Sequence, residues 1–205
     1  MSIKLYHATF ARSLRVVWLL EEMGLAYELE KVKLALGETG GAVLAAVNPL
    51  QKVPTIEIDG EVLQESTAIL EFVANRLGGE DMILPVNDPD YGRFLQWLHG
   101  GEAGFGIYIS MYFGHTLLLP EEDRDPKMVA WSVHNLKKML ALFGDALGQR
   151  KFIAGDKFTI ADISVGYICS GLNLVGQLEN LAPKNVVTWY QSLAARPAFV
   201  KANSL

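Results

Sequence analysis

Short apolar runs alternate with helical stripes over about the first eighty residues of the chain. One helical stripe begins at Arg12 and ends at Gly24, a weaker one ends near Ala45, and a third ends at Gly78-Gly79. The predicted strands cover residues 3–7, 26–32, 55–58 and 61–63. The pattern predicts an α/β unit in which βαβ is followed by αββα.

The pattern changes to helices alone after the segment "GGEDMILPVNDPD", whose prolines and acidic residues are typical of a linker. Apolar positions at helical spacing then recur in 91–98, 133–147 and 186–193, with no convincing strand between them. We therefore predict an α/β domain over 1–78, a linker over 79–89 and an all-α domain over 90–205.

One apolar helix in the second half carries its own start signal. In "FTIADISVGYICS", Thr159 and Asp162 have the spacing of a capping box, in which each side chain bonds to the other's backbone N–H. Asp162 is therefore interpreted as a folding signal, in preference to a catalytic acid. Cys169 lies further along the same apolar helix, so a buried and inert thiol is expected.

Composition excludes several classes of function. The net charge is −5 and no basic run is present, which argues against a nucleic-acid partner. No apolar run approaches about 20 residues and the start "MSIKLYHATF" has no signal-peptide build, so we expect a cytoplasmic protein without a membrane span. Cys169 is the single cysteine, which excludes an internal disulfide. The four histidines are scattered, so no metal site is expected.

The segment "NPLQKVPTIEIDGEVLQESTAIL", residues 48–70, carries the candidate binding residues. Pro54 enters a strand, where a cis bond after Val53 would leave the Val53 backbone free to pair with a peptide-like ligand. Glu65-Ser66 opens a helix, whose free N–H groups attract an anion. Lys52 could hold a second carboxylate. The alternatives are a strand-entry proline, an ordinary helix cap and a solvated lysine.

The chain resembles the cytosolic glutathione S-transferases, as a bacterial-type member, over essentially its whole length. The resemblance is carried by "LYHATFARSLRVVWLLEEMGLAYE", "NPLQKVPTIEIDGEVLQESTAILEFVANRL" and "FIAGDKFTIADIS". It implies a thioredoxin-like N-terminal domain, an all-α C-terminal domain, a homodimer and a cis Val53–Pro54 bond. It also implies that Val53 pairs with the cysteinyl part of glutathione, Glu65 and Ser66 hold the γ-glutamyl end, and Lys52 reaches the glycyl carboxylate.

The reaction of this family needs the glutathione thiol as a thiolate, which is the nucleophile. Counting back from Gly24, the position of the family's serine is Phe10, and that of its cysteine is Arg12. Neither expected residue is present. Arg12 and Ser13, at the start of the first helix, are the preferred substitutes. The remaining candidates are Tyr6 and His7, each with a structural role as its alternative, Thr9, whose placement depends on the path of the loop, and a backbone N–H.

The leading hypothesis is therefore a glutathione transferase that takes glutathione as co-substrate and conjugates it to a hydrophobic electrophile. The predicted electrophile pocket lies between the two domains, with an aromatic wall from Phe105, Tyr108, Met111, Tyr112 and Phe113. Core or dimer contacts are the alternative for these side chains. Two other functions remain open: a glutathione-dependent peroxidase or disulfide reductase, and a non-catalytic binding protein of the same fold.

Overall fold

The computed structural model describes residues 1–35 and 38–205, and the chain forms two compact units. The first comprises Met1–Ile83 together with Ala195–Leu205, and the second comprises Leu84–Ala194. The change of unit at residues 83 and 84 falls within the segment expected to be a linker. The last eleven residues, by contrast, belong to the first unit and not to the predicted helical domain.

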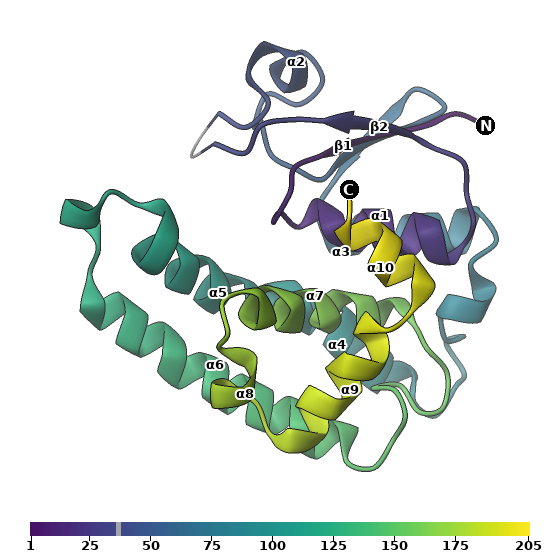
Figure 1. The fold of residues 1–205 in the computed structure, drawn as a ribbon. Coiled ribbons are helices and arrows are strands. Elements are labelled where there is room, and N and C mark those ends of the chain that lie inside the picture. The colour runs from purple at the N-terminus through teal and green to yellow at the C-terminus, as the bar shows by residue number, and fades with distance from the viewer. Residues whose placement is uncertain (36–37) are drawn as a thin grey trace. The chain divides into compact units, whose positions relative to one another are not determined.

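The first unit is built on a four-stranded sheet in the order β2-β1-β3-β4 (Figure 1). β1 pairs in parallel with β2, while β3 pairs antiparallel with both β1 and β4. The strands are Ile3–His7 (β1), Glu28–Lys31 (β2), Thr55–Ile58 (β3) and Glu61–Gln64 (β4). Every predicted strand is present, and Asp59-Gly60 makes the turn between β3 and β4 with positive φ at both residues.

Helices cover both faces of this sheet. Figure 1 shows α1 (Ser13–Glu22) and α3 (Ser66–Arg76) on one side, and the short α2 (Gly41–Ala45) on the other. A single 3-10 turn, η1 (Glu80–Met82), follows α3. Large apolar side chains of β1, β3 and α1 are fully buried, and they form the core that holds the layers together: Leu5, Ile56, Val17, Trp18 and Leu19.

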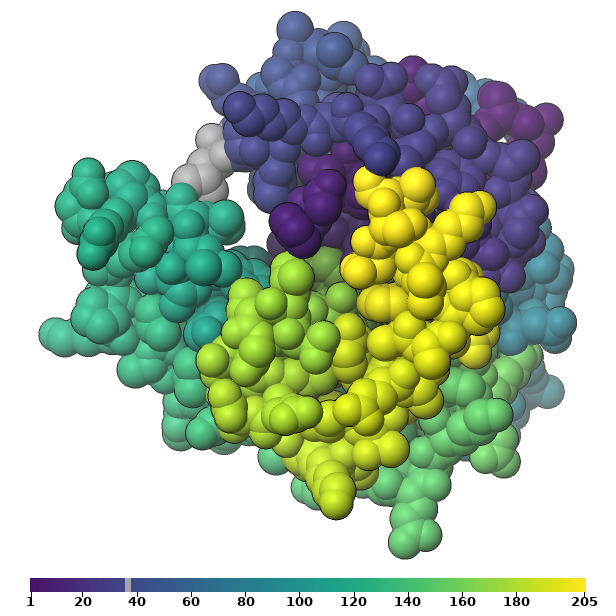
Figure 2. Space-filling model, in the orientation of Figure 1, coloured from purple at the N-terminus to yellow at the C-terminus, as the bar shows by residue number. Residues whose placement is uncertain are grey.

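The C-terminal helix α10 (Pro197–Asn203) packs on α1 and completes the first unit (Figure 2). Phe199 meets the ring of Trp18 edge to face, with centroids 4.8 Å apart. The guanidinium of Arg196 donates to both carboxylate oxygens of Glu22, and its Nη2 lies 2.7 Å from Oε2. Nζ of Lys201 lies 2.7 Å from Oε2 of Glu21. Two ion pairs and an aromatic contact therefore fix the end of the chain to its first helix.

The second unit is helical apart from one isolated β-bridge between Phe152 and Gly155, among its described residues. Its helical elements are α4 (Tyr91–Ala103), α5 (Gly106–Phe113), the π-helical η2 (Gly114–Leu118), the 3-10 turn η3 (Glu121–Asp123), α6 (Pro126–Leu147), α7 (Ile160–Leu174), α8 (Leu178–Leu181) and α9 (Lys184–Ala194). α4 and α7 approach closely because Gly101 faces Ser164, whose hydroxyl donates to the Leu98 carbonyl at 2.7 Å. A side chain at Gly101 would collide with α7.

The capping box predicted at the start of α7 is confirmed. The backbone N–H of Thr159 donates to Oδ2 of Asp162 at 3.0 Å, and the reciprocal bond is also present. The buried Asp162 carboxylate also accepts from the backbone N–H of Ile153 at 2.9 Å and from Nε1 of Trp189 at 3.2 Å. One side chain thus joins the loop before α7, the start of α7 and α9.

Candidate functional site

The approach to β3 is the first part of the candidate site. The Val53–Pro54 peptide bond is cis, which confirms the prediction. No partner for the N–H or C=O of Val53 is found among the residues that the structure describes. The preceding carbonyl of Lys52 is held by the side chains of Thr55, at 2.8 Å, and Asn48, at 3.2 Å. The segment is therefore fixed by its neighbours, while the peptide groups of Val53 remain available to a ligand.

The start of α3 is the second part. The first helical bond runs from the N–H of Ile69 to the carbonyl of Glu65, at 2.9 Å. Within residues 1–35 and 38–205, the N–H groups of Ser66, Thr67 and Ala68 have no acceptor. Such a cluster of free N–H groups, at the positive end of the helix dipole, is a site for a carboxylate.

Glu65 does not cap this helix. Its backbone has φ 66° and ψ 107°, a conformation that non-glycine residues rarely adopt, and its side chain makes no capping bond. The carboxylate is exposed. Such a strained residue is more often maintained by function than by stability. The ordinary helix cap that was the alternative for Glu65 is therefore not what the structure contains.

Arg15 belongs to the site, although it was not predicted from the sequence. It lies on α1 and is fully buried, and its Nη1 donates to Oγ of Ser66 at 3.0 Å. A buried guanidinium needs polar partners, and this one links α1 to the start of α3. The signal that could have revealed it is a charge inside the apolar run "SLRVVWLL", where every residue is buried.

The loop between β1 and α1 is the third part. Phe10, at the position of the family's serine, has φ 64° and is 71% exposed. Arg12 is half-buried and precedes the first residue of α1. Ser13 is fully buried, and its Oγ lies 2.9 Å from Nδ1 of His7 and accepts from the N–H of Ala8 at 3.2 Å. The backbone N–H of Ser13 has no acceptor among the described residues.

The other candidate donors have structural surroundings. Tyr6 is buried, its hydroxyl donates to Oε1 of Glu57 at 2.7 Å, and burial raises its pKa. Burial, assisted by the charge of Lys31, lowers the pKa of His7 to about 4, so its ring is neutral at neutral pH. Thr9 is exposed in the loop. The structural interpretations of Tyr6 and His7 are thus supported by their burial and contacts.

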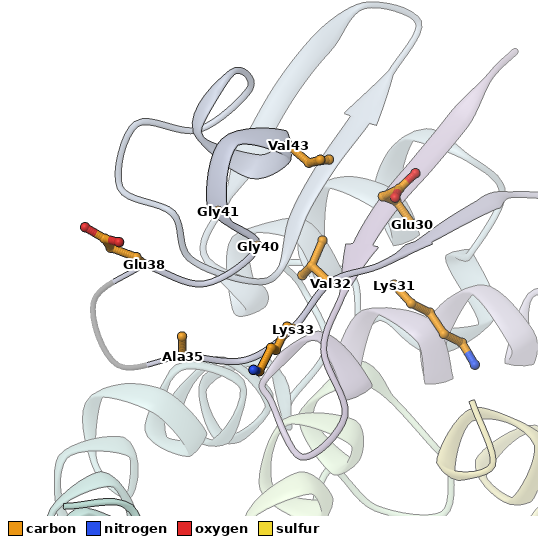
Figure 3. A pocket seen from close by; sticks show the side chains of 9 residues that line it. All are labelled: Glu30, Lys31, Val32, Lys33, Ala35, Glu38, Gly40, Gly41 and Val43. Carbon is orange, nitrogen blue, oxygen red and sulfur yellow. The ribbon is translucent and has the colours of Figure 1, made fainter.

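A hollow of about 420 Å³ lies at the end of β2, and it does not include the predicted binding residues. Figure 3 shows that it is formed by the end of β2, the loop that follows and the start of α2. Its lining residues are Glu30, Lys31, Val32, Lys33, Ala35, Glu38, Gly40, Gly41 and Val43. The hollow is open and carries charges of both signs at its edge. Its lining contains neither Val53 nor the start of α3, so the free backbone groups described above, and not this hollow, define the candidate site.

The aromatic residues expected to line an electrophile pocket have mixed surroundings in the second unit. Phe105 is fully buried and belongs to the core. Tyr108 packs edge to face on Trp131, with centroids 5.0 Å apart, and Tyr112 packs on Phe113 at 5.6 Å. Tyr108, Tyr112 and Phe113 are half-buried, so α5 carries a half-exposed aromatic surface, and Trp131, which packs against Tyr108, is an exposed residue of α6.

Cys169 is fully buried, and burial raises the pKa of its thiol to about 12, which confirms the expected unreactive thiol. Across residues 1–35 and 38–205, no three His, Cys, Asp or Glu side chains gather in a way that could hold a metal ion. In the same ranges, no helix combines the length and the apolar character that crossing a membrane requires.

Comparisons with known proteins agree with this geometry. A family model for the glutathione S-transferase N-terminal domain matches residues 1–75, and one for the C-terminal domain matches residues 113–202. Glutathione S-transferase F13 of Arabidopsis thaliana is 29% identical over 210 residues, which cover 99% of this chain and 95% of the relative.

Solved structures with glutathione bound are also similar. A sphingomonad glutathione S-transferase complexed with glutathione is 27% identical with a TM-score of 0.83, and covers 98% of this chain and 97% of its own. A glutathione transferase homologue from Lodderomyces elongisporus, with two glutathione molecules per subunit, is 25% identical with a TM-score of 0.86, and covers 100% of this chain and 98% of its own. These matches confirm the predicted fold class, a thioredoxin-like sheet unit and a helical unit.

Proposed function

Because the chain belongs to the glutathione S-transferase family, we propose that it is a glutathione transferase whose site is formed by the three segments described above. The observation that carries the proposal is the set of unpaired backbone groups at Val53 and at the start of α3. A short peptide with a charged amino terminus and two carboxylates matches these groups. Glutathione is such a peptide, and it serves as co-substrate.

Glutathione binds in an extended conformation beside the segment that enters β3. Its cysteinyl peptide pairs with the N–H and C=O of Val53 next to the cis Pro54, in an antiparallel ladder with that segment. Its γ-glutamyl carboxylate accepts from the free N–H groups of α3 and from Ser66, while Glu65 faces the ammonium group. Lys52, exposed and beside Val53, takes the glycyl carboxylate.

Arg12 and Ser13 stabilise the thiolate. The Ser13 contribution is its backbone N–H, since its hydroxyl is engaged with His7 and Ala8. The guanidinium of Arg12 adds positive charge at the same helix start. The thiol proton passes to solvent, the sulfur electron pair forms a C–S bond with the electrophile, and the leaving group departs where the reaction is a substitution.

The acceptor in this proposal is a small hydrophobic electrophile. The half-exposed aromatic surface on α5 supports an apolar partner. We further propose a cytoplasmic homodimer that acts in detoxification and has no nucleic-acid or membrane partner, with residues 79–89 as the linker between the domains. The net charge of −5 supports the absence of nucleic acid.

A second function is favoured by one observation. Phe10 is exposed where serine-type relatives would present a hydroxyl to the sulfur. A protein that binds glutathione without activating it would have this feature too. Such a protein would bind glutathione through Val53 and Ser66 in the same way and leave the bound thiol protonated.

Two measurements on the same samples separate these functions. Calorimetry measures the Kd for glutathione, and an ultraviolet difference titration measures the pKa of the bound thiol. Ser66→Ala should weaken glutathione binding by roughly tenfold to a hundredfold, since a hydrogen bond to a charged group contributes about 1.5–3 kcal/mol. The control Ser204→Ala, at an exposed position, should leave the Kd unchanged.

Arg12→Ala should raise the pKa of the bound thiol by about one unit, and Arg150→Ala, at an exposed position, is the control.

A bound thiol with a pKa near ~8.5, the ordinary value, would refute the transferase and leave the binding protein. Absence of glutathione binding by the folded protein would refute both functions.

A further inference from the structure

One buried side-chain contact closes the turn between β1 and α1. Nδ1 of His7 lies 2.9 Å from Oγ of Ser13, and the same oxygen accepts from the N–H of Ala8 at 3.2 Å. His7 is the last residue of β1 and Ser13 is the first residue of α1, and both are buried. The contact therefore determines where the helix begins relative to the sheet.

Both partners are suited to a permanent contact. The ring of His7 is neutral at neutral pH, because burial and the charge of Lys31, its register partner on β2, disfavour the imidazolium. A neutral imidazole has one donor and one acceptor nitrogen, and a hydroxyl can serve either of them. Breaking the contact would leave the buried Nδ1 of His7 unpaired, which costs free energy, while Oγ of Ser13 would keep the N–H of Ala8 at 3.2 Å and the carbonyl of Ala8 at 3.3 Å.

We propose that His7 is a positioning residue for thiol activation, because it holds Ser13, and with it the preceding Arg12, at the place where the sulfur of glutathione binds. This inference rests on the proposed function. The contact occupies the hydroxyl of Ser13, and the backbone N–H of Ser13 has no acceptor among the residues that the structure describes. Stabilisation of a charge by such donors depends on their placement, and a shift of about 1 Å lowers it markedly.

The test compares three variants in the full chain. His7→Leu removes the ring contact, and His7→Asn retains a polar group in the place of Nδ1 that can bond to the Ser13 hydroxyl. Ser13→Ala removes the hydroxyl and keeps the backbone N–H. His134→Leu, at an exposed position on α6, is the matched control. For each variant, ultraviolet difference titration gives the pKa of the bound glutathione thiol, and calorimetry gives the Kd of glutathione.

His7→Leu and Ser13→Ala should each raise the thiol pKa by about one unit, a tenfold loss of thiolate below that pKa. The Kd, measured at a pH below the pKa of the bound thiol so that the protonated thiol is the form bound, should change by less than about threefold, because the carboxylate contacts are elsewhere. His7→Asn and His134→Leu should retain the wild-type pKa. In the double variant the thiol pKa should rise no further than in Ser13→Ala alone, since the contact with His7 is already absent there.

An unchanged thiol pKa in His7→Leu, with the wild-type thiol clearly acidified, would overturn the inference and leave the proposed function intact. If His7→Leu does not fold, Ser13→Ala decides in the same way, because an unchanged thiol pKa in that variant is equally incompatible with the inference. A wild-type thiol that is not acidified would overturn the proposed function and this inference together.

Discussion

Substitution of Asp162 by alanine should be among the most damaging changes in the second unit. The carboxylate is fully buried and accepts from four donors. Alanine would leave the N–H groups of Ile153, Thr159 and Trp189 unpaired, while the Thr159 hydroxyl can rotate toward another acceptor. An unsatisfied buried donor costs about 1–3 kcal/mol, and water entering the vacated volume recovers part of that cost. We expect a loss of about 3–5 kcal/mol in the free energy of unfolding.

Urea denaturation followed by tryptophan fluorescence measures this loss, since Trp189 is itself one of the donors. Asp156→Ala, at an exposed position in the same loop, is the control and should change stability by less than about 0.5 kcal/mol. Asp162→Asn should have an intermediate effect, because it retains one acceptor oxygen but turns an NH2 group toward the remaining donors.

Two results would contradict this reasoning. A loss below about 1 kcal/mol for Asp162→Ala would mean that the four bonds contribute little. A variant with wild-type stability but greatly reduced kcat would show that Asp162 acts in the reaction, which is the alternative that the capping-box interpretation rejects.

Three further predictions concern the first unit. The pKa of His7 is lowered from 6.5 to about 4, so its contribution to stability is present above pH 6.5 and is lost as the pH falls through 4. Across that window the unfolding free energy of wild type should fall by about 3 kcal/mol relative to that of His7→Asn, and a constant difference would contradict this. Phe10→Gly should raise the free energy of unfolding, measured by urea denaturation, by about 1 kcal/mol, because glycine adopts φ 64° without strain and the exposed ring makes little packing contact. A large decrease in the free energy of unfolding would contradict this. Arg196→Ala should cost about 2 kcal/mol by the same assay, since Arg196 is only 31% exposed and bonds both carboxylate oxygens of Glu22. Lys201→Ala should cost about 0.5 kcal/mol, since Lys201 is 65% exposed and makes a single contact.

The elements of the first unit could be predicted because each strand and helix has a local signal. Period-two runs gave the strands, Asp59-Gly60 gave the hairpin, and Gly24, with φ 63°, ends α1 as expected for a residue after a helix C-terminus. The same reasoning failed for α10. Its attachment to α1 depends on contacts such as Arg196 with Glu22, 174 residues apart, and no local pattern reveals them.

The free backbone groups of the candidate site could be predicted for a similar reason, since a proline and a helix start place them by themselves. Arg15 escaped prediction because its role depends on its contact with Ser66 on another helix. The backbone conformation of Glu65 also has no sequence signal, because positive φ at a glutamate is imposed by the surrounding chain.

The group that activates the thiol is the least predictable part, and the loop geometry explains why. A serine donor would work only if the residue at position 10 pointed its side chain at the sulfur, but here that residue is an exposed phenylalanine with φ 64°. The next hydroxyl along the helix start, that of Ser13, is fully engaged inside the unit with His7 and Ala8. This helix start also carries the backbone N–H of Ser13, which has no acceptor among the described residues, and the positive charge of Arg12. If this chain forms a thiolate, the anion must therefore be stabilised by charge and by the peptide backbone, and its pKa should respond more to Arg12→Ala than to any change of a hydroxyl that touches the ligand.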